Sequence, residues 1–209
     1  MTITKNIQDI LTEIGDKTAL VVAVKYAAPD QITTVVDAGA TNLGFNTYQH
    51  MKQTAPMLPK TAKLHFIGTL QKNKAKKVVE LDPALIQSVD SYPLTKKINS
   101  AAKSINKTQD ILLQVKTDPK KEAGIPKEHI DDLLQKIGLL NNIKTSGLMT
   151  VHPYSENPEN SRPYFREMRS LFENPQKKLE ILSMGMSNDY KIAIQEGATM
   201  VRVGSKIFR

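Results

Sequence analysis

Short apolar runs alternate with helix-forming segments along this chain of 209 residues. Eight runs have the composition and length of buried strands, at residues 19–26, 42–46, 64–68, 85–89, 111–116, 145–150, 179–184 and 200–203. Between them, helical patterns with start and stop signals cover residues 30–37, 92–104, 127–140, 162–173 and 188–196. Eight strands that alternate with helices predict a (β/α)8 TIM barrel, with an open doubly wound sheet as the alternative.

The two ends of the chain are expected to meet in such a barrel. The sequence stops at Arg209, just after the eighth apolar run, so we expect no ordinary eighth helix. The amphipathic segment at residues 7–14 is expected to cover that face instead, because barrel closure brings the ends together. No low-complexity stretch divides the sequence, so we expect one domain over residues 1–209.

The composition and the first residues bear on disulfides, metal ligands and the cellular location of the protein. The sequence contains no cysteine, which excludes disulfides and thiolate metal ligands. The first residues lack the long apolar segment of a signal peptide or a membrane span. We therefore expect a cytoplasmic protein with no membrane partner.

A net charge of +8 raises the question of nucleic-acid binding. The densest basic patch, residues 72–77, leads directly into Val78 and Val79, and the whole segment has an amphipathic helical pattern. This pattern favours lysines on the solvent face of a helix. Aromatic residues make up only 5% of the chain and do not alternate with basic ones, so no base-stacking surface is expected.

Lys25 follows the most apolar run in the sequence, Ala19-Leu20-Val21-Val22-Ala23-Val24. A lysine at the end of a buried strand loses hydration, which makes its neutral, nucleophilic form accessible. A neutral amine is what a Schiff base with a carbonyl compound requires. The alternative is a lysine whose long side chain reaches solvent.

Two clusters of small and polar residues end the last two predicted strands. They are Ser183-Met184-Gly185-Met186-Ser187 and Arg202-Val203-Gly204-Ser205. Barrel enzymes place their chemistry at the carboxyl ends of the strands and commonly bind phosphate after strands seven and eight. Glycine lets backbone N–H groups approach an anion closely, and serine adds hydroxyl donors. These clusters therefore predict a phosphate site.

Several segments in a fixed order resemble the pyridoxal-phosphate homeostasis protein family, from about Leu20 to Phe208. They are residues 23–26, 44–46, 65–74, 88–91, 147–150, 162–165, 182–189 and 201–208. The segment that begins His65-Phe66-Ile67-Gly68 and the segment Ser183-Met184-Gly185-Met186-Ser187 are the most specific. The family has a barrel similar to the N-terminal domain of alanine racemase. It binds pyridoxal 5'-phosphate without an established catalytic reaction.

The resemblance implies a role for each residue of the site. It places the internal aldimine on Lys25 and Arg202 beside the pyridine ring. It places the phosphate on four residues and their neighbouring amides: Ser183, Ser187, Gly204 and Ser205. An aldehyde needs an amine, a phosphate needs N–H and O–H donors, and a ring nitrogen needs a polar partner, so these roles agree with the chemistry of the residues.

Three further residues are assigned with less specific signals. Asn46 is expected to contact the cofactor hydroxyl, or else to cap the segment that follows it. Met149 is expected to pack near the ring, or else to be ordinary core. His65 lies inside a strand and is interpreted as a hydrogen-bonded structural histidine. Neither His65 nor the remaining histidines, His50, His129 and His152, show metal-ligand spacing, and no metal site is expected.

Two residues depart from the family pattern. Phe45 stands where the family usually has glutamate, and Val24 stands where it usually has serine or threonine. Phe45 removes a carboxylate that could position Lys25 or a neighbouring basic group. Altered cofactor affinity or exchange is the expected consequence.

Three functions are compatible with these residues. The first is a monomeric homeostasis protein that holds pyridoxal phosphate and releases it to other proteins, such as apo forms of pyridoxal-phosphate enzymes, with no catalytic residue of its own. The second is an amino-acid racemase, but alanine racemase takes its second base from a further domain, and Tyr26 is expected to point away from the barrel interior. The third is a barrel that binds another phosphorylated metabolite.

Overall fold

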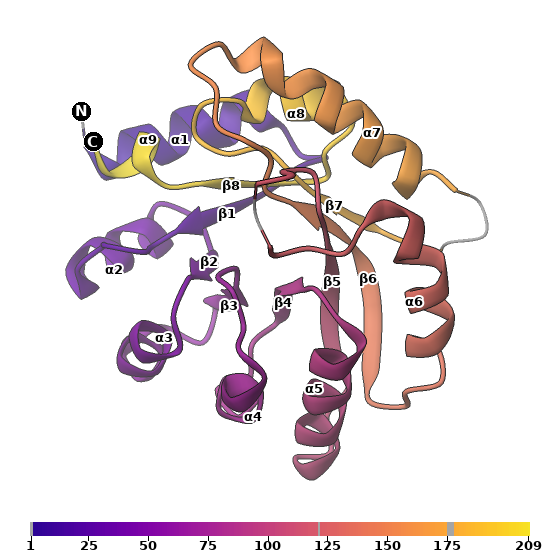
Figure 1. The fold of residues 1–209 in the computed structure, drawn as a ribbon. Coiled ribbons are helices and arrows are strands. Elements are labelled where there is room, and N and C mark those ends of the chain that lie inside the picture. Colours follow the sequence, from indigo (N-terminus) through magenta and orange to yellow (C-terminus); the bar gives the residue numbers. More distant parts are fainter. Residues whose placement is uncertain (1, 121, 175–177) are drawn as a thin grey trace.

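The computed structural model describes residues 2–120, 122–174 and 178–209. Within them, eight parallel strands close into a barrel in sequence order (Figure 1). The strands are β1 (Ala19–Ala23), β2 (Asn42–Phe45), β3 (Lys63–Phe66), β4 (Leu85–Val89), β5 (Gln109–Val115), β6 (Ile143–Thr150), β7 (Ile181–Ser183) and β8 (Met200–Val203). The last strand pairs with the first, with Arg202 opposite Val21, so the sheet has no free edge. The predicted TIM barrel is confirmed, and the open sheet is wrong.

Helices surround the barrel on its outer side (Figure 1). The α-helices are α1 (Ile3–Ile14), α2 (Pro29–Asp37), α3 (Tyr48–Thr54), α4 (Ala75–Val79), α5 (Tyr92–Ser104), α6 (Ile130–Ile137), α7 (Arg162–Phe172), α8 (Tyr190–Gln195) and α9 (Ser205–Phe208). Short 3-10 helices are η1 (Ala55–Met57), η2 (Lys72–Lys74), η3 (Lys127–His129) and η4 (Pro158–Ser161). They join or extend these elements.

Alternation along the strands separates two apolar regions. In β8, Met200 faces the barrel interior, whereas Val201 packs in the larger layer between the strands and the helices. The interior group consists of Val21, Leu85, Leu112, Met149 and Met200. Because a TIM barrel is filled by side chains, this group closes the interior below the carboxyl ends of the strands.

The chain ends lie side by side, as Figure 1 shows. Helix α1 buries Ile7, Ile10 and Ile14 against the core, and the side-chain amide of Asn6 donates to the carbonyl of Ile207 in α9 at 3.0 Å. The expected covering role of the N-terminal segment is therefore confirmed. In place of an ordinary eighth helix, the four residues of α9 follow β8.

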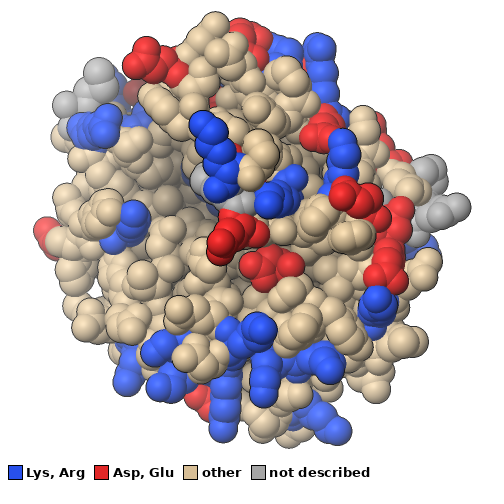
Figure 2. All heavy atoms as spheres, in the orientation of Figure 1, with Lys and Arg blue, Asp and Glu red and all other residues tan. Residues whose placement is uncertain are grey.

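The basic patch at residues 72–77 forms η2 and the start of α4. Lys72, Lys76 and Lys77 are exposed, whereas Val78 and Val79 are buried. Figure 2 shows Lys and Arg side chains gathered along the lower part of the face in view, where Figure 1 has α4 and α5. The lysines thus occupy the solvent face of a helix, as the sequence predicts. No helix among the described residues is long and apolar enough to cross a membrane.

Candidate functional site

A cavity of about 760 Å³ opens where the strands end. In Figure 2 the surface is hollowed left of centre, over the ends of β1 and β8 in Figure 1. The cavity is lined by six of the eight residues that the sequence assigns to the site: Lys25, Asn46, Ser187, Arg202, Gly204 and Ser205. Residues far apart in the sequence thus meet at one place.

Lys25 lies in a turn after β1 and not within the strand. Strand pairing of β1 ends at Ala23, and the side chain of Lys25 is exposed. The expectation that a buried strand deprives this amine of water is therefore wrong, and the alternative in which the side chain reaches solvent is correct. Because it lines the cavity, the amine is accessible to a bound molecule there.

Tyr26 also lies in this turn and lines the cavity, with 86% of its surface exposed. The Lys25 amine lies 4.7 Å from the centre of the Tyr26 ring. The sequence-based expectation that Tyr26 points away from the barrel assumed a continuous strand. Strand alternation no longer applies once the chain has turned, so it does not decide where Tyr26 points.

The turn after β7 and the turn after β8 are joined by Ser187. Its hydroxyl accepts the backbone N–H of Gly204 at 3.1 Å and that of Lys206 at 3.4 Å. A Cβ atom on Gly204 would lie 3.0 Å from the carbonyl oxygen of Ala23, so a side chain there would push against β1. These two contacts use the Ser187 hydroxyl as an acceptor, so its own hydrogen is left to donate to an anion close to the end of β1.

Gly185 allows the β7 turn to take this course. Its φ angle is +90°, a conformation that side-chain-bearing residues rarely adopt. A Cβ atom there would also lie 2.6 Å from the Cβ of Ala193 in α8. Glycine at this position therefore lets the turn pack directly against α8.

Arg202 contributes a guanidinium group to the cavity wall while being 95% buried, with only 5% of its surface exposed. Its terminal nitrogens donate to the Ser183 hydroxyl at 2.6 Å and to the Thr150 carbonyl at 2.7 Å. Burial lowers the pKa of Arg202 to about 10, and the nearby charge of Asp189 acts in the opposite direction. At neutral pH the group therefore remains a cation.

Ser183 and Met149 do not line the cavity. The Ser183 hydroxyl is fully buried between Arg202 and the side-chain oxygen of Gln87, to which it donates at 2.7 Å. Met149 packs in the apolar group inside the barrel. Both residues lie beneath the cavity and support its floor.

Asn46 follows β2 and is half-buried. Helix α3 is capped by its neighbour Thr47, whose hydroxyl accepts the backbone N–H of His50 at 3.3 Å. The alternative in which Asn46 serves as the helix cap is therefore wrong. Its side chain is left on the cavity wall.

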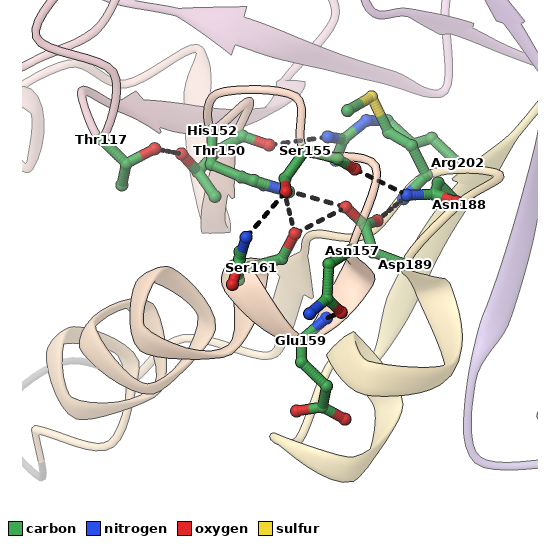
Figure 3. A network of polar contacts seen from close by, with 12 residues as sticks. Thr117, Thr150, His152, Ser155, Asn157, Glu159, Ser161, Asn188, Asp189 and Arg202 are labelled. Carbon is green, nitrogen blue, oxygen red and sulfur yellow. Dashed lines mark hydrogen bonds and ion pairs between the residues drawn. The ribbon is translucent and has the colours of Figure 1, made fainter.

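A cluster of three buried polar side chains adjoins the cavity, and one of them, Asp189, lines it (Figure 3). The ring nitrogen Nε2 of His152 lies 2.8 Å from the hydroxyl of Ser161 and 2.9 Å from a carboxylate oxygen of Asp189. The other Asp189 oxygen accepts the backbone N–H of Met186 at 2.7 Å. Asp189 thus anchors the turn that carries Ser187.

Burial by itself raises the pKa of Asp189. Hydrogen bonds from His152, the Met186 amide and Ser161 outweigh this effect and hold the pKa below its usual value. The carboxylate is therefore charged at neutral pH although it is buried. The sequence reasoning missed this cluster. One signal was available for it, since His152 closely follows the end of β6.

The charge of the cavity suits an anion. Its lining includes three cationic side chains, Lys25, Arg202 and Arg209, against one carboxylate, Asp189, which already has protein partners. Ile67, Val151 and Met186 add apolar surface. The cavity can therefore hold a flat molecule that carries a phosphate and a carbonyl group.

Comparison with known proteins agrees with this description. The family model of the alanine racemase N-terminal domain matches residues 1–209. A pyridoxal phosphate homeostasis protein from Aquifex aeolicus is 37% identical over 192 residues, which cover 89% of this chain and 84% of that protein. One from Synechocystis is 35% identical over 207 residues, with coverage of 96% and 94%.

The chain belongs to the pyridoxal phosphate homeostasis protein family. This confirms the resemblance read from the sequence. The structure of PipY from Synechococcus elongatus with pyridoxal phosphate bound has a TM-score of 0.92 and 29% sequence identity, with 100% of both chains covered. An alanine racemase from Clostridium difficile, 14% identical, has a TM-score of 0.82 and matches 99% of this chain and 56% of its own length. That likeness shows the shared fold.

The two departures from the family pattern lie outside the cavity wall. Phe45 is fully buried in the layer between strands and helices, and its ring meets the edge of His50 with ring centres 5.4 Å apart. Val24 is buried in the same layer. The effect of both residues on the cofactor stays a prediction.

Proposed function

We propose that this chain binds pyridoxal 5'-phosphate in the cavity at the ends of the strands and takes part in its homeostasis, holding the cofactor and releasing it to other proteins. The observation that carries the proposal is that an accessible amine, Lys25, shares a cavity with a buried cation and with phosphate-type donors. The PipY structure contains pyridoxal phosphate in a closely similar fold.

Ser187, Gly204 and Ser205 fit the phosphate group. Backbone N–H and hydroxyl groups from two adjacent turns converge there, and both kinds of donor bind phosphate oxygens well. The Ser187 hydroxyl accepts the N–H groups of Gly204 and Lys206, so its own hydrogen is left to donate and the hydroxyl is positioned before a ligand arrives. Positioned donors reduce the loss of entropy on binding.

Lys25 and Arg202 fit the other end of the cofactor. Lys25 would hold the aldehyde end through its amine, Arg202 would face the ring nitrogen with its guanidinium, and Asn46 would face the ring hydroxyl. When bound, pyridoxal phosphate supplies an electrophilic aldehyde and a ring that withdraws electrons. Ser183 and Met149 act from beneath, through Arg202 and the barrel interior.

Release to apo-enzymes, a monomeric state and one domain over residues 1–209 are parts of the same proposal. The cytoplasmic location stays a prediction from the sequence.

A ligand series tests the proposal. Pyridoxal phosphate should bind saturably and change the visible absorbance, whereas pyridoxal should bind more weakly because it lacks the phosphate. Pyridoxine phosphate, which lacks the aldehyde, should bind without that absorbance change. Equal affinity for pyridoxal and pyridoxal phosphate would reject the phosphate site. Binding of pyridoxine phosphate with no response to pyridoxal phosphate would favour a barrel for another phosphorylated metabolite.

Release is tested separately by transfer. Loaded protein, freed of excess cofactor, is mixed with the apo form of a pyridoxal-phosphate enzyme, and the recovered enzyme activity is followed over time. Recovery should match the loss of bound cofactor. A loaded protein that retains its cofactor while the apo-enzyme stays inactive would contradict the homeostasis role and leave binding intact.

A further inference from the structure

Four buried polar side chains form a continuous row across the barrel interior, from β3 through β4 and β7 to β8. They are His65, Gln87, Ser183 and Arg202, with 4%, 0%, 0% and 5% of their surfaces exposed. Consecutive members lie 3.0, 2.7 and 2.6 Å apart. This polar row lies between the cavity and the apolar group of the interior.

The row has a direction that starts at its charged end. Arginine can only donate, so the Ser183 hydroxyl accepts from Arg202 and passes its own hydrogen to Gln87. The amide oxygen of Gln87 is then an acceptor, and its NH2 group faces the Nδ1 atom of His65. The row ends at His65, whose ring is neutral and whose unprotonated Nδ1 atom accepts from the NH2 group of Gln87. Burial, with a smaller effect of Lys63, lowers the pKa of His65 to about 4 and keeps the ring neutral at pH 7.

The row restricts a side chain that is otherwise long and flexible. Arg202 has two anchors, the Thr150 carbonyl and the Ser183 hydroxyl. A hydroxyl rotates freely unless its hydrogen has an acceptor, and Gln87 supplies that acceptor. The two anchors use two of the five N–H donors of a guanidinium, which leaves donors for the cavity.

We propose that Gln87, held by His65, is a positioning residue that fixes the guanidinium of Arg202 against the ring nitrogen of the bound cofactor. The inference rests on the proposed function, because it takes pyridoxal phosphate as the ligand. Gln87 does not line the cavity and acts only through Ser183 and Arg202.

A positioning role and a purely structural role of Gln87 predict different effects on ligand binding when the residue is replaced. Gln87 is fully buried, so its replacement weakens the fold in either case. Loss of stability alone weakens every ligand alike, whereas misplacement of Arg202 weakens only the contact with the ring nitrogen. The ratio of the affinities for a cofactor with the ring nitrogen and for an analogue without it therefore distinguishes a positioning role of Gln87 from a purely structural one.

The probes are pyridoxal phosphate and its 1-deaza analogue, in which a C–H group replaces the ring nitrogen. The native protein should prefer pyridoxal phosphate by about tenfold, the loss expected for one charge-assisted hydrogen bond. Gln87→Leu should reduce this preference to about twofold or less. Leu85→Val, which alters an apolar residue inside the barrel on the same strand, should keep the native preference.

Folding of each variant is checked by thermal melting without ligand. If Gln87→Leu does not fold, Ser183→Ala breaks the same row by removal of one oxygen atom and should also lose the preference. A folded variant of either kind that keeps the native preference would overturn the inference. A native protein that binds both probes equally would overturn it as well. Failure of the native protein to bind pyridoxal phosphate at all would instead reject the proposed function.

Discussion

The hydroxyl of Ser187 accepts the backbone N–H of Gly204, with 3.1 Å between the two atoms. This contact joins the turn after β7 to the turn after β8. The two turns proposed to bind the phosphate are therefore joined by a side chain as well as by the backbone hydrogen bond from Arg202 to Gly185.

Substitutions in the two turns should differ in effect. Gly204→Val places side-chain atoms against Ala23, so we expect a destabilisation of about 1–3 kcal/mol and a large loss of affinity for pyridoxal phosphate. Ser205→Ala leaves the backbone amides in place and should weaken binding much less. Binding titrations with thermal melts of the same samples check this order. Equal losses for the two variants would show that the backbone approach at Gly204 is unimportant.

The acid sensitivity of the fold should depend on His65. Burial lowers its pKa from 6.5 to about 4, so between these values the unfolded chain binds a proton that the native chain does not. The contribution of neutral His65 to stability is therefore complete above pH 6.5 and falls as the pH drops towards 4, by about 3 kcal/mol in total.

Urea unfolding between pH 7 and pH 4 measures this slope. His65→Gln should be less stable than the native protein at pH 7 but should lose less stability on acidification, because glutamine does not titrate. Parallel pH profiles for the two proteins would show that other groups cause the acid sensitivity.

The sequence predicted the barrel because its strands carry strong local signals. The bounds of β4, β8 and α5 agree with the predicted segments, since compact apolar runs and a proline in the first helical turn mark them. Helix α3 was missed because it is a single short helix whose only start signal is Thr47. Local patterns report on neighbours in the sequence, and short elements carry few of them.

The contacts within the site were harder to predict from the sequence. Six candidate residues meet at the cavity because strand ends converge in any barrel, which is a property of the fold. The sequence left two alternatives for Lys25, a buried amine and an exposed one, because the place where β1 stops depends on pairing with β2 and β8. Gln87 did leave a signal, as an amide within the short buried strand β4. Its partners Ser183 and His65 come from distant parts of the chain, which no local pattern reveals.

Amino-acid turnover should be slow or absent. Racemisation uses bases on opposite faces of the substrate, and Tyr26 lies beside Lys25 and not across the cavity from it. A charged guanidinium at the ring nitrogen also disfavours protonation of the ring, which reduces its capacity as an electron acceptor. Loaded protein in deuterated water with single-enantiomer amino acids should show negligible α-deuterium incorporation and no loss of optical purity.

Rapid incorporation with racemisation would promote the racemase alternative. Tyr154, a second phenol on the cavity wall, would then be the group to examine. Tyr154→Phe would abolish the exchange if that phenol served as the second base, and a matched Tyr48→Phe change outside the cavity would leave it unaltered.

The most direct test of the account is to locate the covalent bond between cofactor and protein. Protein mixed with pyridoxal phosphate is reduced with borohydride and digested, and the labelled peptide is identified by mass spectrometry. The label should lie on Lys25. The Lys25→Ala protein should carry no label. Its free energy of unfolding should lie within about 0.5 kcal/mol of the native value, because the side chain is exposed. Lys72→Ala, a change at an exposed lysine of the basic patch, should be labelled as the native protein is. A label on Lys72 or Lys206, or undiminished labelling of a folded Lys25→Ala protein, would contradict the assignment of the site.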